Sequence, residues 1–319
     1  MNSESWRPIA GPAVATNRAR LLQRAREFFD TRGILEVDTP ALSKFAVTDP
    51  HIESLSASSA TDPELFLHTS PEYGMKRLIA AGFGDIYQIC KVFRDGERGR
   101  NHLAEFTLVE WYRLSFGLQE IMRDTIEFVA ALLDRSNLAS SAEYISYDEA
   151  FQTAVNLSPR TADVAELSNC MNADGQLKSA IGDKADAWLD LVLADKIIPQ
   201  FAEDKLTVIF HYPARQAALA RICPDDAMVA DRFELFYGNL ELANGFVELT
   251  DADEQLSRFE RDRQARRENE AAVHQVDPEL INALRAGLPP CAGVAVGFDR
   301  LLMLHEGQSD ISAVTNFID

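Results

Sequence analysis

A stretch of twenty residues sets the tightest limit on how this chain can fold. Residues 93–112 read FRDGERGRNHLAEFTLVEWY and follow IYQICKV at 86–92, a run rich in β-branched and aromatic side chains. The sequence predicts two strands joined by a charged loop, because Gly96 and Gly99 lie between the two segments of strand character. The period of two in a strand places four residues on one face of the second strand: Phe106, Leu108, Glu110 and Tyr112.

That predicted face combines apolar side chains with a carboxylate and a phenol. Burial of Glu110 is costly unless a cation pairs with it. The loop supplies side chains suited to polyphosphate, namely Arg94, Arg98, Arg100 and His102. A hairpin with phosphate-binding groups at one end and a carboxylate near the other indicates an enzyme that activates an amino acid with ATP.

Composition excludes several other classes of protein. The 319 residues include 31 basic and 50 acidic side chains, a net charge of −19, which disfavours broad contact with a polyanion, although a local basic patch could still bind RNA. The four cysteines are scattered without CxxC spacing, which predicts reduced thiols and no zinc site. The first residues lack a signal-peptide core, and no apolar run approaches the length of about 20 residues that spans a membrane, so we expect a cytoplasmic protein.

Hydrophobic periodicity predicts the arrangement of the remaining elements. The expected helices are 18–32, 73–82, 118–133, 251–270 and 277–286, with a final helix from Asp299. The expected strands are 34–38, 66–69, 86–92, 106–112, 206–211, 294–298 and, as one long strand or a hairpin, 233–248. We expect a flexible tail at 1–17, a loop with an edge strand at 41–63, a helical insertion without obvious chemistry at about 135–200, and a solvated face along 251–270. Strands without strict βαβ alternation favour an α+β fold with a mainly antiparallel sheet.

Two further stretches carry charged side chains on strands that ought to be buried. The segment RFELFYGNLELANGFVEL at 232–249 contains Glu234 and Glu241, which could hold Mg²⁺ on the oxygens of ATP. Strict alternation separates Glu241 from Asn244 and Glu248, so a bulge or break is expected, at Gly245.

The other stretch is GVAVGFDR at 293–300, a glycine-bracketed strand that enters a helix. Glycine allows close approach of a ligand, and Arg300 can neutralise a terminal phosphate. Each group taken alone has a plainer interpretation: a strand glutamate at an exposed edge, His102 as a loop histidine, Arg300 as a surface residue. The order and combination of the three stretches carry the functional interpretation.

These motifs resemble the catalytic core of class II aminoacyl-tRNA synthetases, and within them the lysine group. The stretch at 93–112 is similar to the second motif of the class, and GVAVGFDRLLML at 293–304 to the third. The first motif of the class corresponds to the expected helix at 18–32 and the strand that follows it, up to Pro40. In that class this motif forms the dimer interface, so the resemblance implies a homodimer. SPE at 70–72 and the segment 232–249 are typical of the lysine branch, and the match covers about 18–306.

The chain starts at this core, without an anticodon-binding barrel, and so resembles the truncated elongation factor P–(R)-β-lysine ligases. Ala295 supports the narrower match, because lysyl-tRNA synthetases have glycine in this strand and the ligases have alanine. The resemblance implies one catalytic domain at 18–319 that activates (R)-β-lysine or lysine with ATP and transfers it to a lysine of elongation factor P, without tRNA anticodon binding. Two alternatives remain open: a ligase that loads a lysine-like amino acid onto another carrier or small molecule, and a non-catalytic regulatory protein.

The resemblance also implies roles for individual residues. The catalytic set is Arg94, His102 and Arg300, and the metal set is Glu234 and Glu241. The ATP-binding set is Arg94, Asp95, Glu97, His102, Phe106, Glu241, Leu242, Gly297 and Arg300. The substrate-binding set is Ser70, Pro71, Glu72, Glu110, Tyr112, Asn244, Phe246, Glu248 and Ala295.

The chain departs from the family in the same hairpin. The family motif reads H-N-P-E-F where this chain has His102-Leu103-Ala104-Glu105-Phe106. Leu103 replaces an asparagine that helps to bind ATP, and the loss of one hydrogen bond typically costs about 0.5–1.5 kcal/mol. Weaker binding of ATP is therefore expected.

Overall fold

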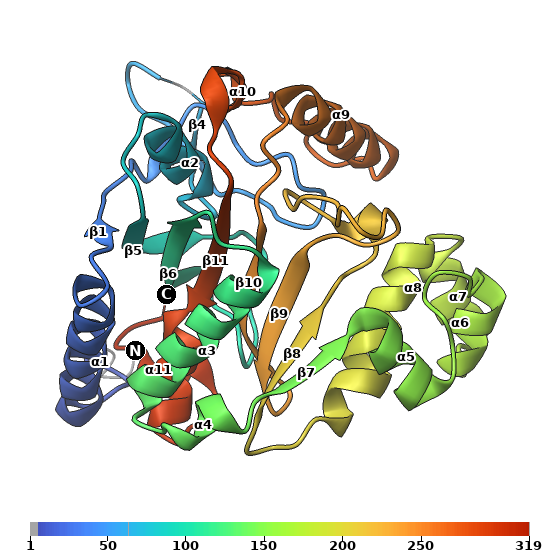
Figure 1. The fold of residues 1–319 in the computed structure, drawn as a ribbon, viewed down its shortest axis with the longest axis horizontal. Coiled ribbons are helices and arrows are strands. Elements are labelled where there is room, and N and C mark those ends of the chain that lie inside the picture. Colours follow the sequence, from blue (N-terminus) through green and yellow to red (C-terminus); the bar gives the residue numbers. More distant parts are fainter. Residues whose placement is uncertain (1–5, 63, 319) are drawn as a thin grey trace.

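An eight-stranded sheet forms the centre of the computed structural model, which describes residues 6–62 and 64–318 (Figure 1). In spatial order the strands are β1 (Leu35–Glu36), β5 (Ile86–Phe93), β6 (Glu105–Leu114), β11 (Cys291–Gly297), β10 (Leu240–Val247), β9 (Arg232–Tyr237), β8 (Leu206–Phe210) and β7 (Glu143–Ser146). Only the outer pairs β1–β5 and β7–β8 are parallel. The prediction of an α+β fold with a mainly antiparallel sheet is confirmed, and so is the β5–β6 hairpin. A second sheet has three strands, β2 (Leu42–Ser43), β4 (Leu65–Leu67) and β3 (Ser56–Ala57).

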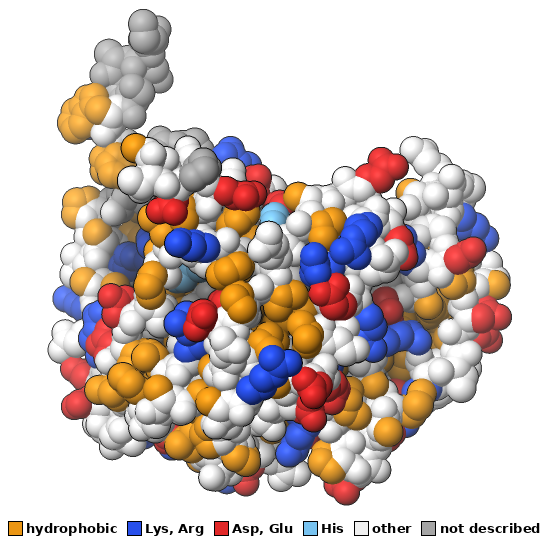
Figure 2. Space-filling view, turned by 90° about the horizontal axis from the view of Figure 1, so that it is seen from above, with side chains coloured by type: hydrophobic (Ala, Val, Ile, Leu, Met, Phe, Trp, Pro, Cys, Tyr) orange, Lys and Arg blue, Asp and Glu red, His pale blue; other side chains and the backbone are white. Residues whose placement is uncertain are grey.

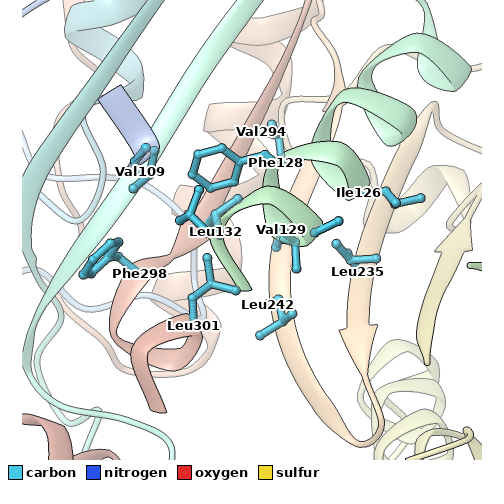
Figure 3. Close-up of a cluster of buried hydrophobic side chains, with 14 of the residues drawn as sticks. Val109, Ile126, Phe128, Val129, Leu132, Leu235, Leu242, Val294, Phe298 and Leu301 are labelled. Carbon is cyan, nitrogen blue, oxygen red and sulfur yellow. The ribbon is translucent and has the colours of Figure 1, made fainter. Parts of the chain in front are cut away.

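One face of the large sheet is covered by α1 (Pro12–Asp30), α3 (Leu118–Leu133) and α11 (Phe298–His305). Val109 of β6, Val294 of β11 and Leu235 of β9 point from the strands into a core shared with Phe128 and Leu301 (Figure 3). Since successive side chains of a strand alternate between its faces, Glu110 and Ala295 lie on the opposite face. The apolar core thus fixes which side chains are directed toward the site.

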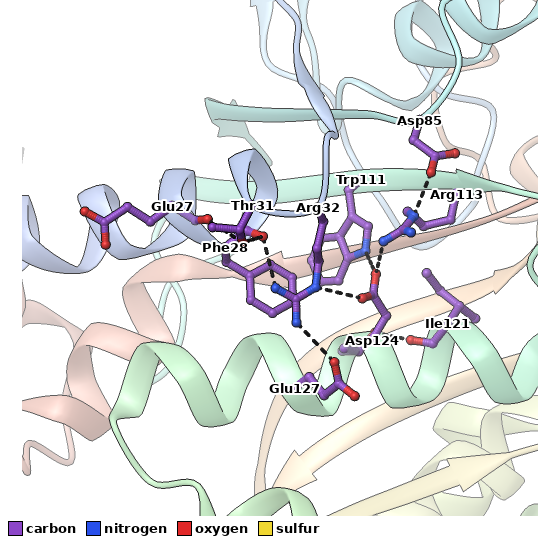
Figure 4. A network of polar contacts seen from close by, with 11 residues as sticks. Glu27, Phe28, Thr31, Arg32, Asp85, Trp111, Arg113, Ile121, Asp124 and Glu127 are labelled. Carbon is purple, nitrogen blue, oxygen red and sulfur yellow. Dashed lines mark hydrogen bonds and ion pairs between the residues drawn. The ribbon is translucent and has the colours of Figure 1, made fainter.

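A network of polar contacts joins helices α1 and α3 to strand β6 of the hairpin (Figure 4). Asp124 of α3 accepts hydrogen bonds from Trp111 Nε1 at 3.0 Å and from an Arg113 guanidinium nitrogen at 3.2 Å. Arg32, at the end of α1, lies 3.8 Å from Asp124 and 3.2 Å from Glu127. Burial raises the pKa of Asp124 while Arg113 acts in the opposite direction. The network therefore ties β6 to two helices, because its central carboxylate needs these cations once it is out of water.

The other face of the sheet carries α2 (Glu72–Ala80), α9 (Ala252–Glu268) and α10 (Pro278–Gly287), which share a second apolar cluster. Helix α9 was expected to be solvated, and this is wrong for part of its length. Arg266 is fully buried and donates hydrogen bonds to the backbone carbonyls of Thr48, Asp49 and Ile52. Helix α9 consequently holds the loop that follows β2.

The insertion forms a helical lobe beside the β7 edge of the large sheet (Figure 1). Its apolar cluster around Trp188 and Phe151 also includes Ile209 of β8 and Phe236 of β9. The helices of the lobe are α5 (Tyr147–Val155), α6 (Val164–Cys170), α7 (Gly175–Ile181) and α8 (Ala185–Val192), followed by a π-helical turn (Leu193–Ile197) and a 3-10 turn (Ile198–Gln200). The short helix α4 (Asn137–Ser140) precedes the lobe and packs on α3, where Leu138 joins the core that contains Phe128. Further 3-10 turns are Ala214–Gln216 and Ile311–Val314. The range 135–200 is not wholly helical, because β7 lies within it and pairs with β8 of the large sheet.

Two other expectations need correction. Helix α1 begins at Pro12, where proline suits the first turn, so 12–17 is not a tail; residues 1–5 lie outside the described residues. The bulge in β10 lies between Glu241 and Ala243 instead of at Gly245. Gly245 has a packing role, because a Cβ there would come within 2.6 Å of the Phe233 ring.

In the part of the chain that the structure describes, every helix is too short or too polar to cross a membrane. The strands of the described residues all belong to the two sheets above, and these residues contain no separate anticodon-binding barrel.

Candidate active site

A cavity of about 730 Å³ opens on the face of the sheet opposite the apolar core. The hairpin, β10, β11, α2 and the loop between β2 and β3 contribute its walls. All of the predicted substrate-binding residues line it: Ser70, Pro71, Glu72, Glu110, Tyr112, Asn244, Phe246, Glu248 and Ala295. Arg94 and Glu234 line it as well. The structure thus brings together side chains from four separate stretches of the sequence.

Glu110 is buried at the floor of this cavity. Its carboxylate accepts hydrogen bonds from Ser70 Oγ at 2.8 Å and from the Tyr112 hydroxyl at 2.7 Å. Burial raises the pKa of Glu110 to about 7, and the charge of Glu72 acts in the same direction. A positive ligand group in contact with this carboxylate would restore the ionised form.

Glu248 is the second buried carboxylate, with 2% of its surface exposed. Its Oε2 lies 2.6 Å from Lys76 Nζ, and among the described residues its Oε1 has no hydrogen-bond donor. Burial raises the pKa of Glu248 to about 8, which Lys76 opposes. Asn244 Oδ1 also lacks a donor within the described chain. Two buried acceptors beside one cavity are suited to a ligand that carries an ammonium group, since buried polar groups normally have partners.

The bulge in β10 explains why Glu241 and Asn244 share a face of the sheet, although of these two only Asn244 lines the cavity. It shifts the alternation by one residue, so that Glu241 lies on the same face as Asn244 and Phe246. It also turns the side chain of Leu242 into the apolar core, where 1% of its surface is exposed. The predicted contact of Leu242 with ATP can therefore involve its backbone alone.

Arg94 stands between the cavity and the loop of the hairpin. Its Nε donates to the Thr69 carbonyl at 3.3 Å, and Nη1 lies 3.5 Å from the Glu97 carboxylate. Its guanidinium carbon is 5.2 Å from the centre of the Phe106 ring. The next residue, Asp95, is held by a backbone hydrogen bond to Glu53 of 2.8 Å. Arg94 thereby lies between the predicted amino-acid end and the predicted phosphate end of the site.

The remaining predicted nucleotide groups form a connected set around Arg300. One guanidinium nitrogen donates to the Glu241 carbonyl at 2.7 Å, and another donates to His102 Nε2 at 2.7 Å. Partial burial and the nearby Arg300 charge lower the pKa of His102, so this imidazole is a neutral acceptor. Gly297 precedes the helix, and a Cβ there would be 3.5 Å from the nearest Arg300 atom, an ordinary contact.

Comparison with known proteins identifies the family. The family model of class II tRNA synthetases (D, K and N) matches residues 12–318. A protein of Avibacterium paragallinarum named elongation factor P–(R)-β-lysine ligase is 41% identical over 99% of this chain and 98% of its own length. This chain is also similar to two proteins of the same name. The protein of Pseudoalteromonas translucida is 42% identical over 99% of this chain and 98% of its own length. The protein of Yersinia enterocolitica is 41% identical over 98% of this chain and 97% of its own length. The chain belongs to the elongation factor P–(R)-β-lysine ligase family. It is accordingly an amino acid–protein ligase built on a class II synthetase domain.

ATP use is expected for this ligase family, and the residues can be tested for their fit to the Mg²⁺ that would accompany ATP. Glu241 has a half-exposed carboxylate that makes one long contact, 3.5 Å to Arg300, and leaves room for a cation. Glu234 is partly buried, with 13% of its side chain exposed, and already accepts hydrogen bonds from Arg232 at 2.7 Å and from the Tyr212 hydroxyl at 2.7 Å. Glu241 therefore fits a metal ligand directly, whereas Glu234 would have to exchange a partner.

Several residues of the site were not predicted from the sequence. Lys76 is buried beside the carboxylates, yet its spacing of four from Glu72 on a helix would ordinarily indicate a surface ion pair. Asp186 and Asp190 of the insertion also line the cavity, although the insertion was expected to lack chemistry. Asp262 of α9 lines it too, and burial with the neighbouring Asp49 raises its pKa to about 6. Only the packing of the insertion and of α9 against the site places these carboxylates here.

A group outside this cavity also has ligand-like spacing. His211, Cys223 and Asp231 have potential ligand atoms that lie within 4.8 Å of one another. Arg221 donates to Asp231 at 2.6 Å and supplies the positive charge that a metal would otherwise bring. The four cysteines are free thiols, as expected.

Proposed function

We propose that this ligase activates (R)-β-lysine with ATP and transfers it to a lysine side chain of elongation factor P. The observation that carries the proposal is that Oε1 of buried Glu248 has no hydrogen-bond donor within residues 6–62 and 64–318. Glu248 lies with Glu110 in the cavity that Arg94 also lines. An amino acid with a second amino group supplies an ammonium for these carboxylates and a carboxylate for Arg94. The names of the relatives support (R)-β-lysine and elongation factor P as the substrates.

The position of Ala295 supports a lysine-type substrate of altered geometry. In the sheet register Ala295 lies opposite Glu110 on β6 and opposite Asn244 on β10. Its methyl group therefore occupies the floor between two polar side chains that would contact the substrate. The size of the side chain at position 295 affects where the amine next to the substrate carboxylate can lie. A β-amino acid and an α-amino acid differ in the position of that amine.

In the first step, a carboxylate oxygen of the amino acid attacks the α-phosphorus of ATP, and pyrophosphate leaves. Arg94 would contact the carboxylate and the α-phosphate, where its charge stabilises the transition state. Phe106 and Arg300 would hold the adenine ring between them, and neutral His102 would lie near the leaving pyrophosphate. Asp95, Glu97 and Gly297 would complete the nucleotide site. Mg²⁺ held by Glu241, with Glu234, would neutralise phosphate charge when bound.

In the second step, the amine nitrogen of the acceptor lysine attacks the carbonyl carbon of the adenylate. A C–N bond forms, the bond to AMP breaks, and the amine loses its proton. No nucleophile of the ligase takes part, so its contribution is to position and stabilise the reacting groups.

The surroundings of the site are consistent with a protein acceptor and not with a broad nucleic-acid surface. In the view from above, basic and acidic side chains are interspersed over the surface of the molecule (Figure 2). A net charge of −19 does not favour a tRNA backbone. We propose that the enzyme works in the cytoplasm without binding a tRNA anticodon.

A homodimer through the first motif is also part of the proposal. Leu35 of the edge strand β1 is 51% exposed, and it borders a hollow of about 420 Å³ between β1 and α1. An exposed leucine on an unpaired strand edge is suited to a second copy of the same surface. Sedimentation of the full chain would test this.

ATP–pyrophosphate exchange tests the proposed activity. Exchange that depends on (R)-β-lysine, followed by labelling of purified elongation factor P but not of tRNA, is the expected result. Exchange with labelling of a different carrier would support the alternative ligase. Absence of exchange with (R)-β-lysine, lysine and the other amino acids would refute both and leave a non-catalytic role.

A further inference from the structure

Lys76 is a buried cation that lies behind the carboxylates of Glu72 and Glu248, on the side away from the cavity. Only 1% of its surface is exposed, and the described lining of the cavity includes Glu72 and Glu248 but not Lys76. Its Nζ lies 2.6 Å from Glu72 Oε1 and 2.6 Å from Glu248 Oε2. The side chain passes Phe246, whose ring centre is 5.7 Å from Nζ. The ammonium is thus fixed behind the two carboxylates, where a substrate does not reach it.

The charged neighbours of Glu248 come from helix α2 and strand β6. Helix α2 contributes Glu72 and Lys76, and β6 contributes Glu110. Glu248 itself directly follows the last residue of β10. Tyr112 of β6 and Cys291 of β11 also face these groups, and burial raises the pKa of both, so they are neutral. Three carboxylates and one ammonium remain, which gives two uncompensated negative charges when all are ionised.

That number matches the proposed substrate. (R)-β-Lysine carries two ammonium groups, and its carboxylate would contact Arg94. Buried charges are tolerated when they are paired, and a mismatch of one charge leaves either a carboxylate or an ammonium without a partner. With a neutral residue in place of Lys76, three carboxylates would share the pocket, and mutual repulsion would favour protonation of one of them.

We propose that Lys76 is a positioning residue that sets the charge and orientation of Glu72 and Glu248, so that the pocket accepts an amino acid with two ammonium groups in preference to one. The inference rests on the proposed function and adds the group that determines charge specificity. Lys76 acts through the carboxylates and does not touch the substrate.

The test compares Lys76→Met, which removes the charge, with Lys76→Arg, which retains it. ATP–pyrophosphate exchange is measured between pH 6 and 9 with (R)-β-lysine and with (R)-3-aminohexanoic acid, which lacks the second amine. For Lys76→Met we expect a KM for (R)-β-lysine raised about tenfold or more at pH 7, with the KM for ATP within about twofold. The acidic limb of kcat/KM should move up by about one pH unit, since loss of the cation favours the protonated carboxylates. Lys76→Arg should keep most of the native preference for the diamine.

A charge-swap variant separates this role from a purely structural one. Lys76→Met combined with Glu72→Gln restores two net negative charges, whereas Glu72→Gln alone leaves one. The double variant should therefore bind (R)-β-lysine more tightly than Glu72→Gln, and it keeps the test available if Lys76→Met alone does not fold. Circular dichroism checks that each variant is folded.

The possible outcomes distinguish the inference from the function on which it rests. A folded Lys76→Met protein with the native KM and pH profile would overturn the inference, as would a double variant that binds no better than Glu72→Gln. If the native protein shows no exchange with any lysine-type amino acid, the proposed function fails and the role of Lys76 fails with it. Native exchange with the expected shifts in the variants supports both.

Discussion

Gly293 lies so close to Glu248 that a Cβ on Gly293 would come within 2.6 Å of the carboxylate Oε1. The same Cβ would be 2.4 Å from the Tyr112 ring. The glycine was expected to admit a ligand, but the space beside it is filled by two side chains of the protein, both predicted to bind the substrate. Gly293 therefore determines where a carboxylate and a phenol can be placed.

Gly293→Ala should displace Glu248 and Tyr112 and so weaken binding of the amino acid. Overpacking of this kind typically costs about 1–3 kcal/mol in stability, and the KM for (R)-β-lysine should rise more than the KM for ATP. Thermal unfolding and exchange kinetics measure the two effects. Gly297→Ala is the matched control, because its Cβ would find only an ordinary contact of 3.5 Å, and it should leave the KM for the amino acid unchanged. Equal effects of the two substitutions would contradict the steric explanation.

Arg94→Ala should abolish most of the exchange activity while the protein remains folded. Removal of one electrostatic contact to the transition state commonly lowers kcat by about 100- to 1000-fold. Arg94→Lys keeps the charge but loses the two-pronged geometry, so an intermediate activity is expected. Near-normal exchange by Arg94→Ala would refute the role assigned to Arg94.

The stability of the ligand-free protein should fall as pH rises from about 5 to 8. Glu110 and Glu248 have pKa values raised to about 7 and about 8, above the ordinary value of 4.5, so in this range the folded protein holds protons that the unfolded chain has released. Each such proton contributes a slope of up to about 1.4 kcal/mol per pH unit. Glu248→Gln should flatten the fall of the unfolding temperature with pH. A slope that is the same in the variant and the native protein would show that Glu248 does not hold the proton.

Local patterns predicted the hairpin and its faces, because the period of two in Phe106–Tyr112 assigns alternate residues to opposite faces of β6, both of which are buried. The same alternation failed in β10, where the bulge at Leu242 is set by the packing of Leu242 and Phe233 against other elements. A single sequence holds no signal for that choice between Leu242 and Gly245. The need for an irregularity was predicted, and its position was not.

Lys76 and Arg266 show a different limit of sequence-based prediction. Both lie on helices with acidic neighbours at a spacing that usually indicates a solvent-exposed ion pair. Their burial depends on β10 and on the loop at 48–53, which are distant in the sequence. Tertiary contacts of this kind decide whether a charged residue is at the surface or within the site.

Arg266→Met should loosen the loop at 48–54 that forms part of the cavity wall. Arg266 donates to the carbonyls of Asp49 at 2.7 Å and of Ile52 at 2.6 Å, and it pairs with Glu53 at 2.8 Å. Unsatisfied buried polar groups cost about 1–3 kcal/mol, so a lower unfolding temperature and faster proteolysis within this loop are expected. Arg267→Ala, at the exposed neighbouring position, is the control and should behave like the native protein. Unchanged proteolysis of the Arg266 variant would mean that other contacts hold the loop.

Leu103→Asn should improve the affinity for ATP by restoring the amide that the family motif carries. One recovered hydrogen bond of about 0.5–1.5 kcal/mol corresponds to a KM for ATP lowered about two- to tenfold. Leu103 is partly buried against the apolar core, so the substitution should also lower the unfolding temperature. Leu103→Ala removes the same packing without providing an amide, and its KM for ATP should stay at the native value. If Leu103→Asn and Leu103→Ala have the same KM for ATP, position 103 does not contact the nucleotide in this ligase.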